Sequence, residues 1–156
     1  MDLNIALAKG LHTLAAVIWV GGMFFAYMAL RPVAATLLQP VQRLPLWAGV
    51  FAKFFIWVWC AILLLPATGF WMVFHLFQDM SSVGLHVHIM TLLGIIMILL
   101  FLYLFFIPYL QLRLALLDAD LATAGKKLAQ IRVIVGINLV LGLVTVVMGS
   151  GGRYLF

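Results

Sequence analysis

Four long stretches without a charged residue divide this chain, and they constrain its fold more than any other feature. They cover residues 10–30, 54–78, 80–112 and 133–152. Each has at least the roughly 20 residues that an α-helix needs to cross a hydrocarbon core about 30 Å thick. Only 8% of the residues are charged and the mean hydropathy is +1.27, which lies outside the range of soluble domains. The sequence therefore predicts an all-α, integral membrane four-helix bundle. We place its spans at about 4–30, 54–78, 84–111 and 133–151.

We expect residues 1–156 to form a single transmembrane domain. The longest connections between spans, residues 31–53 and 113–132, are too short to hold a soluble domain. We expect the first span to stay in the membrane, because it lacks the basic start and small-residue exit of a signal peptide. Cys60 is the only cysteine, so no disulfide framework or redox pair is expected. The chain has no nucleic-acid signature, and its expected partner is the lipid bilayer.

The distribution of Lys and Arg predicts how the chain is oriented in the membrane. Seven of these residues fall in the first and third connections: Arg31, Arg43, Lys53, Arg113, Lys126, Lys127 and Arg132. Only Lys9 and Arg153 fall on the other side. Because short cytoplasmic loops accumulate Lys and Arg, we expect both termini to be periplasmic in a multi-pass protein of the bacterial inner membrane.

The four histidines fall near one end of the predicted bundle. They are His12, His75, His86 and His88. With both termini periplasmic, all four lie in the outer half of the membrane. An ionisable residue inside a span is a functional candidate by default, and His12 lies within the first span. A histidine at the interface can also be a neutral side chain bonded to a carbonyl, which is how we interpret His75.

Helical periodicity predicts which residues of the first and fourth spans face the bundle interior. At about 100° per residue, His12 and Trp19 share one face of the first span with small residues. Membrane helices pack through small residues, so we expect His12 to point inward. A second small and polar stripe in the fourth span contains Asn138, Gly142, Thr145 and Gly149. That stripe either receives a neighbouring helix closely or clears room for a flat cofactor.

The second and third spans carry further candidate faces. A line along the second span contains Cys60, Leu64, Thr68, Trp71 and His75. In the third span, His86 and His88 lie about 200° apart around the helix axis, so only one of them can face inward. His86 shares a face with Met90, and His88 shares a face with Thr91. The sequence leaves this choice open.

Three segments carry a family resemblance. They are LHTLAAVIWVGGMFFAYMALRP (residues 11–32), VHIMTLLGIIMILLFLYLFFIPYLQLR (87–113) and IRVIVGINLVLGLVTVVMGSGGRY (131–154). Together they resemble the small, single-domain members of the CopD-type copper-resistance membrane family. The first helix is more distantly similar to HemJ, a four-helix membrane protoporphyrinogen oxidase that carries haem b. The resemblance places the family's histidines at His12 and His88 and implies copper handling. HemJ has a His-x-Lys pair where this chain has His86 and His88, which argues against HemJ's enzymatic activity here.

Haem b is the first chemistry that these residues predict. If His12 and His88 face each other, they provide the two axial imidazoles of a six-coordinate haem iron. Trp19, Asn138 and Thr145 would line the porphyrin. Arg153 would pair with a propionate. Such a protein would transfer electrons to or from a quinone or a periplasmic redox partner. A homodimer is one way to enclose the porphyrin, because four helices alone leave little room.

Copper is the alternative chemistry. Imidazole binds either oxidation state of copper and thioethers select Cu(I), so His86, His88 and Met90 could form an outer copper site. His12 or Met148 would complete that site. A transporter needs ligands through the depth of the membrane, and the chain has few of them at the inner face, so a one-sided site fits better than a complete conduit.

A third hypothesis is a structural or assembly partner in which the histidines only pack. Whether the chain is an enzyme, such as a membrane oxidoreductase, stays open. The carboxylates lie in loops or at the terminus: Asp2, Asp79, Asp118 and Asp120. No buried acid and base pair is therefore available for general acid–base catalysis.

Overall fold

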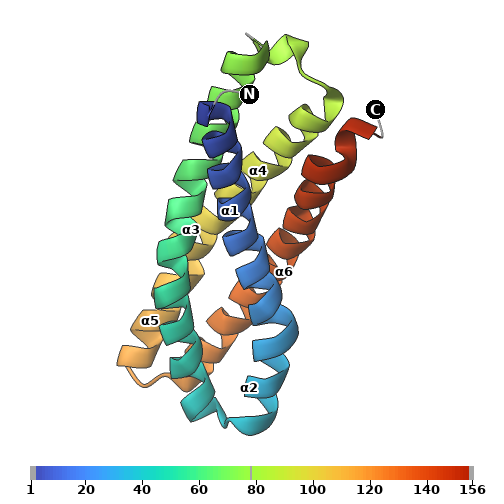
Figure 1. The fold of residues 1–156 in the computed structure, drawn as a ribbon. Coiled ribbons are helices and arrows are strands. Elements are labelled where there is room, and N and C mark those ends of the chain that lie inside the picture. Colours follow the sequence, from blue (N-terminus) through green and yellow to red (C-terminus); the bar gives the residue numbers. More distant parts are fainter. Residues whose placement is uncertain (1–2, 78, 155–156) are drawn as a thin grey trace.

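The computed structural model describes residues 3–77 and 79–154, and the side chain of Arg153 lies outside that description. The described residues form four helical rods packed side by side (Figure 1). The first rod is α1 (Leu3–Phe25), η1 (Ala26–Leu30) and α2 (Arg31–Leu37), and the second is α3 (Pro40–Phe77). The third rod is α4 (Leu85–Leu104), η3 (Phe105–Tyr109) and α5 (Leu110–Leu117), and the fourth is α6 (Leu121–Gly151) with η4 (Gly152–Tyr154). A short turn, η2 (Met80–Ser82), joins α3 to α4. All described secondary structure is helical, which confirms the predicted fold class.

The rods are longer than the predicted spans. They contain 35, 38, 33 and 31 residues, and each is apolar enough to cross a membrane. The connections expected at residues 31–53 and 113–132 are mostly helical, and the chain turns only at residues 38–39 and 118–120. With 38 residues, α3 is about 57 Å long at 1.5 Å per residue. The helices continue past the uncharged stretches because Arg and Lys are good helix formers although they are costly in hydrocarbon.

The bundle has two distinct ends (Figure 1). The start of α1, the α3–α4 connection and the end of α6 lie at one end, which we call the histidine end. The turns at residues 38–39 and 118–120 lie at the other, which we call the basic end because the seven Lys and Arg residues of the first and third connections lie toward it. The assignment of the histidine end to the periplasm remains a prediction from the charge distribution.

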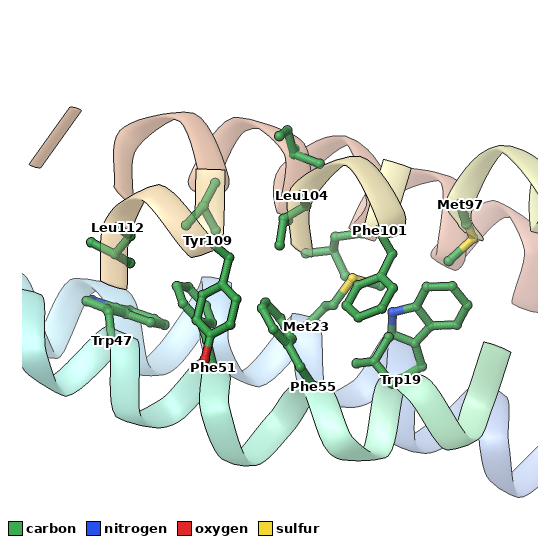
Figure 2. Close-up of a cluster of buried hydrophobic side chains, with 14 of the residues drawn as sticks. Trp19, Met23, Trp47, Phe51, Phe55, Met97, Phe101, Leu104, Tyr109 and Leu112 are labelled. Carbon is green, nitrogen blue, oxygen red and sulfur yellow. The ribbon is translucent and has the colours of Figure 1, made fainter. Parts of the chain in front are cut away.

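Aromatic rings fill the core between the middle of the bundle and the basic end (Figure 2). Phe55 of α3 is at the centre of this cluster. Its ring centroid lies 5.2 Å from that of Phe51, 5.3 Å from that of Phe101 and 4.9 Å from that of Tyr109. The Phe51 ring stacks on it, whereas Phe101 and Tyr109 meet it edge-to-face. Aromatic pairs of both kinds add about 0.5–1.5 kcal/mol beyond burial. The aromatic cluster therefore joins α3 tightly to α4 and η3.

Small residues let α6 approach its neighbours closely. A Cβ added at Gly142 would lie 2.9 Å from Cγ2 of Val20 on α1 and 3.2 Å from Cε of Met97 on α4. The space beside Gly142 is therefore already filled by two side chains from neighbouring helices. At this position the small-residue stripe of the fourth span receives other helices and does not clear room for a flat cofactor.

Gly142→Ala should destabilise the bundle by about 1–3 kcal/mol, because the new methyl group overpacks a filled contact. Val20 is β-branched and has little freedom to move aside. Gly21→Ala is the matched control, since nothing lies within 4 Å of a Cβ at that position, and Ala is the better helix former. Thermal unfolding of both variants in detergent measures the difference. Equal midpoints for the two variants would contradict the proposed close contact.

Candidate functional site

All four histidines come from elements that meet at the histidine end. His12 lies on α1, His75 in the last turn of α3, and His86 and His88 in the first turn of α4. His75 is exposed and its ring stacks on Trp71, with the ring centroids 4.8 Å apart. This contact fits our interpretation of His75 as an interfacial side chain.

His12 is half-buried against α3. Its Nδ1 lies 2.8 Å from Oγ1 of Thr68, and the Thr68 hydroxyl in turn donates to the carbonyl of Leu64 at 2.5 Å. Because a hydroxyl has a single hydrogen to donate, Thr68 accepts its bond from His12 Nδ1–H. The Nε2 atom of His12 therefore keeps its lone pair. Hydrogen bonding of one ring nitrogen to a fixed acceptor is the arrangement that orients metal-ligating histidines.

The structure decides which histidine of α4 faces the bundle. His86 packs against α6, because a Cβ added at Gly152 would lie 2.6 Å from its Cβ. Its Nδ1 is buried and, within the described part of the chain, has no hydrogen-bond partner. His88 is exposed on another face of α4. The inward position that the haem hypothesis gives to His88 is therefore occupied by His86.

Two methionines lie beside His86 along the seam between α4 and α6. Met90 follows His86 by one helical turn, and its Sδ lies 3.6 Å from the position of a Cβ at Gly149. The Cε of Met148 lies 3.7 Å from the position of a Cβ at Gly152. Met148 is 9% exposed. The seam thus holds one imidazole and two thioethers, which are the ligand types that suit Cu(I).

The other predicted site residues have packing roles or lie away from this seam. Trp19 is 3% exposed and its ring meets Phe101 edge-to-face at 6.4 Å (Figure 2). Asn138 donates from Nδ2 to the carbonyl of Met97 at 3.2 Å and so ties α6 to α4. Thr145 bonds to the carbonyl of Leu141 in its own helix at 2.8 Å. The side chain of Arg153 falls outside the described residues.

Among the residues that the structure describes, no carboxylate is placed with the histidines as a metal site. Within the described part of the chain, no group of three or more His, Cys, Asp or Glu side chains is placed to hold a metal ion. Asp79 instead fixes the α3–α4 connection, where its Oδ1 accepts hydrogen bonds from Oγ of Ser82 at 2.6 Å and Oγ of Ser81 at 2.7 Å. These bonds lower the pKa of Asp79 from its ordinary value. The stability they add is fully present above that ordinary value and is lost as the pH falls through the lowered pKa.

Sequence reasoning gave Thr68 and Met148 only minor parts. Thr68 appeared in the line along the second span, and Met148 appeared as a neighbour of an outer copper site. The sequence placed both residues at the same end of the bundle as the histidines. It could not show that Thr68 bonds to His12 or that Met148 lies near His86, because those contacts depend on which helices pack together. Two cavities, one beside Gly49 and Trp57 and the other beside Tyr27 and Arg132, contain no histidine in their linings.

Comparison with known protein families identifies the family of the chain. The family model for copper resistance protein D, CopD, matches residues 48–151. That range contains Thr68, His86, His88, Met90 and Met148, whereas His12 precedes it. No curated protein and no solved structure matches the chain, and the likeness to HemJ remains a prediction. The match covers most of the chain and agrees with the four membrane-spanning helices. The chain therefore belongs to the CopD family of inner-membrane proteins, which is associated with copper resistance.

Proposed function

We propose that the chain binds Cu(I) at the histidine end of the bundle through His86, Met90 and Met148. The observation that carries this proposal is the buried Nδ1 of His86, which has no hydrogen-bond partner among the described residues. The Cβ of His86 and the Cε of Met148 both lie near Gly152, and Met90 lies one helical turn further along α4, beside Gly149. An unsatisfied buried nitrogen costs about 1–3 kcal/mol. A bound cation that uses the ring as a ligand offers a way to recover part of that cost.

The donor set favours copper over other metals. Thioethers select Cu(I), whereas Zn²⁺ prefers thiolates, imidazoles and carboxylates. Groups of the zinc type are lacking among the described residues. The CopD description points to the same metal. With the orientation predicted by the positive charges, the copper would be bound on the periplasmic side.

The packing of the core favours binding at one face over conduction through the membrane. Met23 and Met97 are each 3% exposed and lie within the packed core. The space between them and the basic end is filled by the aromatic cluster around Phe55 (Figure 2). A copper ion would need rearranged helices to pass this region. We therefore propose a copper-binding protein that receives or delivers the ion at one surface.

Haem b is the second candidate, and the His12 geometry favours it. A histidine that donates from Nδ1 to Thr68 presents Nε2 as an iron ligand. Because His88 is exposed, a porphyrin bound by both rings would lie at the surface of one chain. A second copy of the chain would enclose it. When bound, the haem would supply one-electron transfer to a quinone or a periplasmic redox partner.

Removing one ligand should weaken Cu(I) binding by at least about tenfold. Mutating only a group that hydrogen-bonds to a metal ligand already lowers metal affinity by about 10–100-fold. The variants are His86→Ala, Met90→Leu and Met148→Leu, and the measurement is competition with a Cu(I) chelator under reducing, anaerobic conditions in detergent. Met28→Leu is the control, because Met28 is 58% exposed and lies toward the basic end. Wild-type protein that binds Cu(I) no more tightly than the three ligand variants would refute the proposal.

The haem candidate predicts red protein whose visible spectrum shows split bands on reduction. His12→Ala should remove this spectrum. Thr68→Val should lower haem retention about 10–100-fold, because it removes the hydrogen-bond acceptor that orients His12. Thr68→Ser keeps the hydroxyl and is the matched control. Colourless wild-type protein from haem-supplemented cells would exclude this candidate while leaving the copper proposal intact.

A further inference from the structure

A pocket of about 540 Å³ lies toward the basic end of the bundle. It is formed where the end of the first rod, the start of α3 and the start of α6 come together. Three arginines line it, one from each of these three rods: Arg31, Arg43 and Arg132. We call it the arginine pocket. It is separate from the copper and haem candidates, which lie at the histidine end.

The three arginines have no acidic counterpart in the arginine pocket. The guanidinium of Arg31 lies 4.8 Å from the centroid of the Tyr27 ring, and Arg43 donates from Nη1 to the carbonyl of Ala35 at 3.4 Å. No carboxylate lines the pocket. Toward the same end, Asp120 uses its carboxylate to cap α6 by accepting from the Thr123 backbone N–H at 2.9 Å. Three cations around one cavity repel each other unless an anion lies between them.

The rest of the arginine pocket is apolar and aromatic. Its walls include Tyr27, Leu44, Trp47, Phe51, Leu128 and Val135. A site for a free phosphate ion would surround the ion with hydrogen-bond donors, whereas these walls suit the glycerol and upper acyl carbons of a lipid. The rods contain 31 to 38 residues and are therefore longer than a hydrocarbon core of about 30 Å, so we expect their basic end to extend past that core. Arginine, tryptophan and tyrosine are typical of the interface at that depth.

We propose that the arginine pocket binds the phosphate headgroup of an anionic phospholipid. Arginine forms paired hydrogen bonds with phosphate oxygens, and its weakly hydrated, planar group stacks on aromatic rings such as Tyr27. Basic pockets between membrane helices on the cytoplasmic side are suited to anionic headgroups. The bound lipid would join α6 to the first rod and α3, which are themselves connected at this end by the turn at residues 38–39.

The test is a titration of the full-length chain in neutral detergent with phosphatidylglycerol, read by native mass spectrometry and by thermal unfolding. Saturable binding with a raised unfolding temperature is expected, and phosphatidylcholine should give neither. Each of Arg31→Gln, Arg43→Gln and Arg132→Gln should weaken binding roughly fivefold, which is about the affinity that one Lys or Arg adds near an anionic lipid surface. The triple variant should weaken binding about 100-fold. Arg113→Gln removes a charge from the same end outside the pocket and should bind as the wild type does.

The controls separate a lipid site from a free anion and from general surface charge. Inorganic phosphate should not displace the lipid, and displacement by phosphate at similar concentrations would overturn the lipid assignment. Equal loss of binding in Arg113→Gln and in the pocket variants would show attraction by net charge alone and would also overturn it. Arg→Lys variants keep the charge without the paired donors and should bind with intermediate affinity. Unfolding midpoints without lipid that equal that of the wild type would show that these variants fold, and this control does not depend on the copper proposal.

Discussion

The packing of aromatic rings around Phe55 is the contact on which the arrangement of the whole bundle depends. This side chain of α3 meets rings from its own helix, from α4 and from η3, with centroid separations between 4.9 and 6.4 Å. Within the hydrocarbon of a membrane the hydrophobic effect does not drive helices together, so van der Waals packing between their side chains has to stabilise the bundle. The rings fill the interior from the middle toward the basic end, and the charged side chains lie toward the ends of the rods.

The two ends carry opposite chemistry as a result. The histidine end offers imidazole and thioether groups, which suit a soft metal ion. The basic end offers guanidinium groups over aromatic walls, which suit an anion. A charged group in the middle of the bundle would face either lipid or aromatic rings, and both environments make its desolvation costly. The candidate sites at the ends and the packing in the middle thus follow from the same constraint.

Glycines of the fourth rod determine how these groups meet. Val20 and Met97 occupy the space beside Gly142, Met90 occupies the space beside Gly149, and His86 occupies the space beside Gly152. Each of these contacts replaces a missing side chain with one from another helix. The candidate copper ligands of α4 therefore approach α6 because α6 has no side chains in their way. A small-residue stripe in the sequence has the same appearance whether it holds a helix or a cofactor, and only the contacts distinguish the two.

The sequence by itself determined the fold class, the number of rods and the gathering of the histidines at one end. These follow from transfer energies that act residue by residue, since long uncharged stretches enter hydrocarbon and charged residues stay outside it. It did not determine the helix ends, because helix propensity continues past the last apolar residue.

Only the tertiary structure decided which of His86 and His88 faces α6. The two lie on different sides of one helix, and the rotation of that helix is set by contacts with Gly142, Gly149 and Gly152 of the fourth rod. The same holds for the hydrogen bond between His12 and Thr68 and for the arginine pocket, whose arginines come from three different rods. Pairings of this kind depend on how the rods pack against one another, and no local pattern in the sequence encodes that packing.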